Sequence, residues 1–187
     1  LYYHFGSAYR MFGRPREALT WAQQSRQAGE DSYDSYSEGL SHVVMGAVHV
    51  MLGHSQLALE HYQQSEKRFQ DMGLTAFVAE VKARFCQLYM CTGDAAQARD
   101  ASLQACQRLE QYNRPYILSQ ALTGLAHAEL ALGNFSESQK VLAEAWKLAN
   151  KLEHPFARCR LHLVSAYAHL VHEDHEHART SADALAN

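Results

Sequence analysis

The pattern of apolar and small residues along the chain repeats every 40 residues. A glycine recurs at positions 13, 53, 93 and 133, and Glu173 occupies the fifth position of this series. One small residue recurs seven positions before each of these turn residues, and a second recurs five positions after it. The two small slots hold Gly6, Gly46, Cys86, Ala126 and Ala166, and then Ala18, Ala58, Ala98, Ser138 and Ala178. A period that is held over the whole chain is typical of a repeat architecture.

Each repeat predicts two helices. Between turns, apolar residues recur three and four positions apart, as in Leu118, Leu122 and Leu125, which indicates an amphipathic helix. The glycine is expected to end the first helix, because a left-handed residue closes a last helical turn at least cost. Asp94 and Asn134 follow their glycines at the position that caps the next helix. The small slots then allow the two helices of a repeat to approach closely.

The predicted fold class is all-α, a right-handed superhelical solenoid of antiparallel helix pairs in about five 40-residue repeats. A single array covers residues 1–187, with units at about 1–32, 33–72, 73–112, 113–152 and 153–187. Pro115 and Pro155, also 40 residues apart, are expected to open the first helices of the last two units. The chain starts without methionine and neither end has a polar cap, so we interpret it as a fragment whose ends self-associate or meet flanking repeats.

These repeats resemble the tetratricopeptide repeat over essentially all 187 residues. That family pairs a large residue, a glycine and a tyrosine in the first helix with an alanine and an aromatic residue in the second. The matching residues are Tyr2, Phe5, Gly6, Tyr9 and Ala18 in the first unit, Met45, Gly46, Ala58 and Tyr62 in the second, and Phe85, Tyr89 and Ala98 in the third. The fourth unit departs from the pattern, with Glu129 in the tyrosine slot and Ser138 in the alanine slot.

The repeat length narrows the resemblance. The usual tetratricopeptide repeat has 34 residues, and HEAT and armadillo repeats run near 40. The turn glycine and the paired small slots favour the tetratricopeptide family. Within it, the 40-residue repeat is similar to the sensor arrays of bacterial regulators of the maltose-activator type. Peptide-pheromone receptors and spindle-orientation adaptors share the long repeat and stay as alternatives.

The resemblance implies a concave groove that is lined by the first helices and holds a protein or peptide partner. Its inward positions lie six before, three before and one after the first small slot, and they also include Leu40, Val43, Ala47 and Thr123. The residues expected to bind the ligand are Glu80, Arg84, Gln87, Gln120, His127, Arg160 and Tyr167. Of the slots that clamp chaperone tails, only Arg84 agrees, and Glu80 would repel a terminal carboxylate. A groove wall that is merely solvated is the alternative.

Composition excludes several other classes. The chain is 47% hydrophobic and 20% charged, with a formal net charge of −3, which suits a folded domain rather than a disordered one. No Lys/Arg run predicts direct nucleic-acid binding, and the longest nearly apolar run, "HVVMGAVHVML", is too short to span a bilayer. The four cysteines form no C-x-x-C pair, so we interpret them as reduced thiols of a cytoplasmic protein.

One short segment raises the question of chemistry. "HEDHEH", His172–His177, has three histidines and three carboxylates, but it occupies the slot of the other turns and Glu176 stands where a His-Glu-x-x-His motif needs histidine. We therefore expect no metal, no cofactor, no catalytic residue and no enzymatic activity. The predicted function is a non-catalytic interaction module, the sensor or scaffold part of a bacterial regulatory protein. The alternatives are a small-peptide or small-molecule receptor that changes superhelix pitch, and a structural self-association spacer.

Overall fold

The structure is a computed structural model that describes residues 2–152, 155–171 and 180–184. The chain divides into two compact units, unit 1 with residues 1–92 and unit 2 with residues 93–187. Unit 1 contains α1 (Tyr2–Met11), α2 (Pro15–Ser32), α3 (Ser35–Met51), α4 (Ser55–Asp71) and α5 (Thr75–Thr92). Unit 2 contains α6 (Ala95–Leu109), α7 (Pro115–Ala131), α8 (Phe135–Leu152) and α9 (Pro155–Val171).

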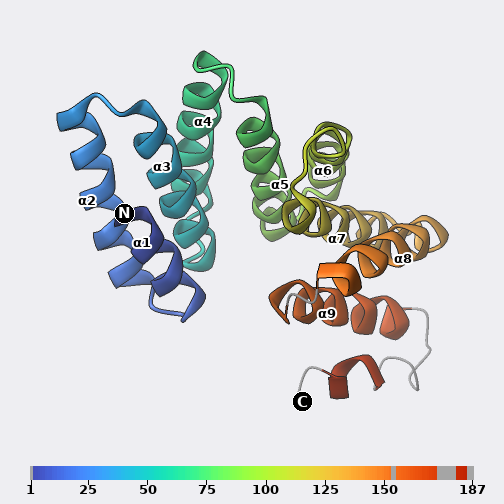
Figure 1. Cartoon of the computed structure of the whole chain (residues 1–187). Coiled ribbons are helices and arrows are strands. Elements are labelled where there is room, and N and C mark those ends of the chain that lie inside the picture. The colour runs from blue at the N-terminus through green and yellow to red at the C-terminus, as the bar shows by residue number, and fades with distance from the viewer. Residues whose placement is uncertain (1, 153–154, 172–179, 185–187) are drawn as a thin grey trace. The chain divides into compact units, whose positions relative to one another are not determined.

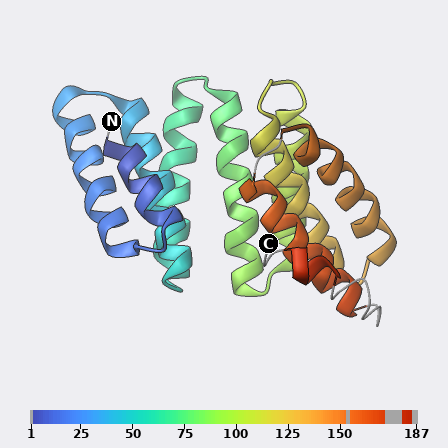
Figure 2. The same ribbon diagram turned by 60° about the horizontal axis from the view of Figure 1, so that its bottom comes forward.

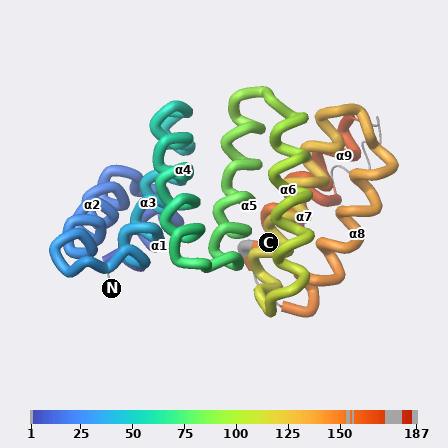
Figure 3. Tube along the Cα trace, turned by 90° about the horizontal axis from the view of Figure 1, so that it is seen from above, coloured from blue at the N-terminus to red at the C-terminus, as the bar shows by residue number. Residues whose placement is uncertain are grey.

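Consecutive helices within a unit pack as antiparallel neighbours (Figure 1). The views agree for α3 and α4, which lie side by side in the tube trace (Figure 3). In unit 2, α7 packs against both α8 and α9 (Figure 2). The predicted all-α class and helix pairing are thereby confirmed, whereas the handedness of a superhelix stays a prediction. Among the described residues, no helix combines enough length with enough apolar character to cross a bilayer.

The ends of the helices follow the sequence signals. Gly53 and Gly133 each adopt a positive φ, 75° and 80°, two residues after the ends of α3 and α7, the conformation that glycine adopts without steric cost. Asp94 caps α6 by accepting a hydrogen bond from the backbone N–H of Gln97 at 3.0 Å. Asn134 differs from that prediction, because its side-chain amide donates to Glu129 at 2.7 Å.

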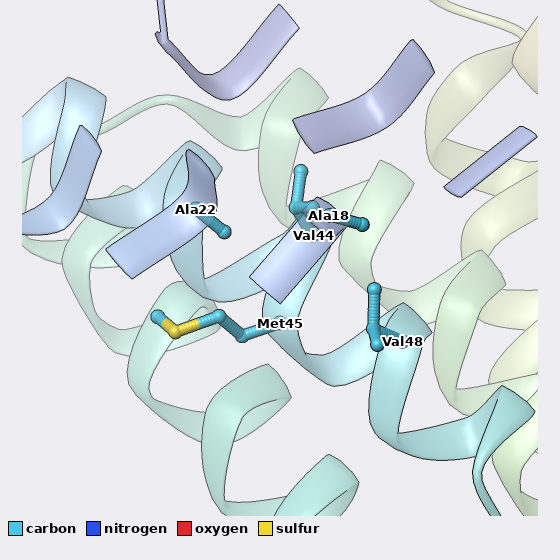
Figure 4. Close-up of a cluster of buried hydrophobic side chains, with 5 residues drawn as sticks. All are labelled: Ala18, Ala22, Val44, Met45 and Val48. Carbon is cyan, nitrogen blue, oxygen red and sulfur yellow. The ribbon is translucent and has the colours of Figure 1, made fainter. Parts of the chain in front are cut away.

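One hydrophobic cluster in the core of unit 1 lies between the second helix of one pair and the first helix of the next. Ala18 and Ala22 of α2 pack against Val44, Met45 and Val48 of α3 (Figure 4). All five side chains are buried. Burying a side chain of the size of valine or methionine contributes roughly 1.5–3 kcal/mol, so these contacts hold α2 against α3.

The small slots permit close contact between the two helices of a pair. A Cβ atom added at Gly46 of α3 would lie 2.6 Å from the ring of Tyr62 in α4, far inside van der Waals contact. In unit 2, Ala126 occupies the same slot of α7, and its carbonyl oxygen accepts a 2.8 Å hydrogen bond from the hydroxyl of Ser138 in α8. The small residues that recur every 40 positions therefore lie where the two helices of a pair make close contact.

Candidate ligand-binding face

The predicted binding residues divide between the two units. Unit 1 carries Glu80, Arg84 and Gln87 on α5, and unit 2 carries Gln120 and His127 on α7 and Arg160 and Tyr167 on α9. All seven side chains are at least partly accessible to solvent. Two other predicted inward positions are buried instead: Ala47 is 7% exposed and Thr123 is 2% exposed. The hydroxyl of Thr123 donates to the carbonyl oxygen of Ser119 at 2.7 Å. Its hydrogen bond therefore lies within α7, and the buried side chain does not contact a ligand.

Three of the predicted residues come together in unit 2. The rings of His127 on α7 and Tyr167 on α9 lie 5.7 Å apart between centroids, with an edge-to-face angle of 84°. Arg160 lies on the same face of α9, two turns before Tyr167. Its positive charge lowers the pKa of His127. Tyr167 is 46% exposed. We call His127, Arg160 and Tyr167 the unit 2 face; Gln120 lies on its α7 side, two turns before His127.

The electrostatics of the unit 2 face favour an anionic ligand. Burial lowers the pKa of His127, and the nearby Arg160 guanidinium lowers that pKa further. The imidazole is therefore neutral at pH 7, with one nitrogen to donate and one to accept. An anion bound between the two groups would offset the charge of Arg160 and raise the pKa of His127 again. Burial and the charge of Arg160 together place the pKa of His127 below its ordinary value of 6.5 in the unliganded protein.

One predicted binding position of unit 1, Glu80, has the opposite charge to Arg160, although the predicted residue Arg84 on the same helix is a cation. Burial raises the pKa of Tyr3 on α1, and the charges of Tyr36 and Glu80 raise it further. Glu80 of α5 is therefore near enough to oppose the formation of a phenolate at Tyr3. A carboxylate ligand would meet the same repulsion there, so an acidic segment is expected to favour the unit 2 face.

Sequence reasoning missed one cluster of ionisable side chains. The structure places His42 and His49 of α3 against His61 of α4 and against His54, which precedes α4. Within the described ranges, no three His, Cys, Asp or Glu side chains converge on a common metal position. The turn 172–177 that raised the question of a metal lies outside the described residues.

Comparison with known proteins agrees with this architecture. Residues 1–71 match the tetratricopeptide repeat family. No curated protein matches the chain in sequence. Among solved structures, the apo form of RapI superposes with a TM-score of 0.83 at 12% identity, covering 99% of this chain and 67% of RapI. A Rap protein complexed with Competence and Sporulation Factor gives 0.81 at 13% identity, covering 100% of this chain and 62% of that protein.

A fungal structure is also similar. The tetratricopeptide-like repeats of a kinesin light chain from Podosopora anserina give a TM-score of 0.68 at 17% identity, covering 98% of this chain and 91% of theirs. These likenesses show the fold, a helical repeat of tetratricopeptide type. The predicted resemblance to tetratricopeptide repeats is confirmed: residues 1–71 match that family, and the solved structures share the fold of the whole chain. The maltose-activator subtype stays a prediction. This chain spans about two thirds of the length of the Rap proteins.

Proposed function

We propose that this protein is a non-catalytic interaction module, the cytoplasmic sensor or scaffold part of a bacterial regulatory protein of the maltose-activator type. Its ligand is an acidic peptide segment of a partner protein. The carrying observation is the unit 2 face, where a cation, a neutral imidazole and an exposed phenol lie together on two neighbouring first helices. Protein-interaction modules of tetratricopeptide type are the class to which the fold points.

The chemistry of the face supports a carboxylate-containing ligand. Arg160 presents five donors in a planar fork, which matches the two oxygens of a carboxylate. His127 and Tyr167 provide a donor and an apolar ring edge beside it. Gln120 on α7 has an amide suited to a peptide carbonyl or N–H group. The proposed peptide therefore places an Asp or Glu side chain, or its C-terminus, at Arg160.

A second candidate is a receptor for a small peptide or small molecule. One specific observation favours it: the similar Rap protein structure contains Competence and Sporulation Factor. In that case the unit 2 face would be one wall of the binding site, and binding would change the pitch of the superhelix. A structural spacer, without any ligand, is the third candidate.

The test is a titration of an acidic peptide library against the intact chain by fluorescence anisotropy. A charge-assisted hydrogen bond is worth about 1.5–3 kcal/mol, so Arg160→Ala is expected to weaken binding roughly 10- to 100-fold. Arg158→Ala is the matched control, because Arg158 lies on the same helix but acts on His162. Circular dichroism checks that both variants keep their helices.

The pH dependence has a definite sign. Protonated His127 attracts an anion, so affinity for the acidic peptide rises as pH falls below 6.5, and His127→Gln removes that rise. Equal affinities of wild type and Arg160→Ala, without a pH effect between 7.5 and 5.5, would place the ligand elsewhere. Absence of binding by every acidic and neutral peptide would favour the spacer.

A further inference from the structure

Four histidines join α3 to α4 in unit 1. Nδ1 of His42 lies 3.0 Å from Nδ1 of His61, and Nδ1 of His49 lies 3.4 Å from Nδ1 of His54. The rings of His49 and His61 stack between these pairs, with centroids 5.3 Å apart and an interplanar angle of 14°. We call these four residues the histidine ladder. It follows the α3–α4 hairpin from the turn at Gly53 to the middle of both helices.

The close nitrogen contacts depend on the protonation state. A neutral imidazole has one donor nitrogen and one acceptor nitrogen, so the 3.0 Å contact of His42 with His61 is a hydrogen bond when one Nδ1 holds a proton. When both imidazoles are charged, both Nδ1 atoms are donors, and two N–H groups then face each other. The contact therefore tolerates one extra proton per pair, but not two.

The surroundings oppose protonation. Burial lowers the pKa of His42 to about 4, and His61, Arg68 and Arg26 add to that effect. Burial also lowers the pKa of His61, with His49 and Arg26 adding to it while Glu60 acts in the other direction.

Most of the charged side chains named here on the neighbouring helices form an ion pair with a side chain of opposite charge. Arg68 of α4 donates to Glu38 of α3 at 3.0 Å, and Arg26 of α2 pairs with Glu30. On α5, Lys82 pairs with Glu66 of α4 at 2.9 Å. The helix α1, which also packs on α3, carries His4 and Arg10.

We propose that the histidine ladder is an acid-sensitive latch, which holds the α3–α4 hairpin closed while its imidazoles are neutral and releases it when the paired imidazoles become charged. When the hairpin opens, α4 no longer covers the face of α3 against which it packs. The latch acts in unit 1 and is independent of the ligand face proposed for unit 2. Regulation by acidification is thus built into one repeat.

The sign of the effect follows from linkage. The folded-state pKa of His42 lies below its ordinary value of 6.5, so its contribution to closure is fully present above pH 6.5 and is lost as pH falls toward 4. For this one residue, the difference predicts a shift of roughly tenfold or more in the opening equilibrium between pH 7.5 and pH 5.0. The shifts of His49 and His61, which have the same direction, add to it.

The repeat itself supplies the matched variant. Eighty residues further on, the slots of His42 and His61 hold Leu122 and Val141, which are both buried in the α7–α8 hairpin. The double change His42→Leu, His61→Val therefore gives α3–α4 a pair that this fold already uses. His61→Gln is a second variant, because glutamine keeps a hydrogen-bonding group but does not titrate.

The experiment is hydrogen–deuterium exchange by mass spectrometry on the intact chain at pH 7.5 and 5.0, corrected for the intrinsic pH dependence of exchange. Peptides from α3 and α4 of the wild type are expected to lose tenfold or more of their protection at pH 5.0, and peptides from α7 and α8 less than threefold. The double variant and His61→Gln are expected to abolish most of the α3–α4 loss. His162→Gln, a control in α9, should leave that loss unchanged.

Two results would overturn the latch. One is an equal loss of protection in α3–α4 and α7–α8, which would mean general acid destabilisation. The other is a full wild-type response in both the double variant and His61→Gln, because the ladder would then not carry the proton sensitivity.

Discussion

The α3–α4 hairpin of unit 1 and the α7–α8 hairpin of unit 2 occupy the same place in the repeat, 80 residues apart, but their facing slots hold different chemistry. Where α3–α4 has His42 next to His61, α7–α8 has the buried apolar residues Leu122 and Val141. Both solutions fill the space between two antiparallel helices. The fold therefore needs side chains that fill these facing positions, but it does not fix their chemistry. Titratable side chains can occupy them and make the hairpin sensitive to pH.

The positions beside the turn also differ between the two hairpins, although both hairpins have polar residues there. His49 meets His54 at 3.4 Å in α3–α4. In α7–α8, the buried carboxylate of Glu129 accepts hydrogen bonds from Asn134 at 2.7 Å and from Arg99 at 2.7 Å. One turn is closed by two imidazoles, where burial and then the charge of His54 lower the pKa of His49. The other is closed by a carboxylate with two donors.

The largest expected effect concerns the tightest contact between α3 and α4. Gly46→Ala places a methyl group against the fully buried ring of Tyr62, and overpacking of this kind costs about 1–3 kcal/mol. Tyr62→Leu leaves a cavity that costs a further 2–3 kcal/mol, roughly. Together the two changes reproduce Ala126 and Leu142 of α7–α8, so the double variant should recover at least about 1 kcal/mol of the sum.

Urea unfolding of the four proteins measures that coupling energy. Strict additivity of the two changes would show that the Gly46–Tyr62 contact does not distinguish the hairpins. Ala126→Gly in α7 is the reverse control, and its loss of about 1–2 kcal/mol combines helix propensity with the removal of a buried methyl group.

A smaller effect is expected at the turn slots. Glu129→Gln removes the charge from two hydrogen bonds of a residue that is 4% exposed, so we expect a loss of about 1–2 kcal/mol in the free energy of unfolding. His49→Gln at pH 7.5 should cost less than about 0.5 kcal/mol, because His49 is only partly buried. Thermal melts at pH 7.5 compare the two, and an equal cost would contradict the difference drawn between the turns.

The smallest effect concerns the chain that leads into α3. Tyr33 has a φ of 57°, whereas Gly73, one repeat later, has a φ of 68°. A left-handed backbone strains a non-glycine residue by roughly 1–2 kcal/mol, part of which glycine loses again through its greater freedom in the unfolded chain. Tyr33→Gly should therefore stabilise the protein by about 0.5–1 kcal/mol, and Gly73→Ala should destabilise it by a similar amount. A loss of stability in Tyr33→Gly would show that the exposed tyrosine makes a contact worth more than the strain.

Much of the fold follows from the sequence, because its determinants are local. The positive φ of Gly53 and Gly133 and the helix starts at Pro115 and Pro155 each depend on one residue type. The division into two compact units does not appear in a pattern that repeats without interruption. Burial of Thr123 could not be predicted either, since it depends on how far α7 rotates toward its neighbours.

The candidate sites depend on contacts between helices, and these were only partly predictable. The resemblance to the family placed His127, Arg160 and Tyr167 on one face, but the lowered pKa of His127 needed its burial to be known. The histidine ladder had an unused signal. His49 and His54 stand equally far from the middle of their turn, and so do His42 and His61. In an antiparallel hairpin, residues at equal distances from the turn face each other.

That mirror relation across each turn has a consequence for how such a chain can diversify after its repeats are duplicated. Two substitutions suffice to exchange one facing pair for another, although the stacked rings of His49 and His61 link neighbouring pairs in α3–α4. Introducing histidines at Leu122 and Val141 would transplant the acid response into the other hairpin, while leaving its small slot at Ala126 intact. Repeated copies of one hairpin can therefore keep the same backbone structure while each copy has different residues in its facing pairs.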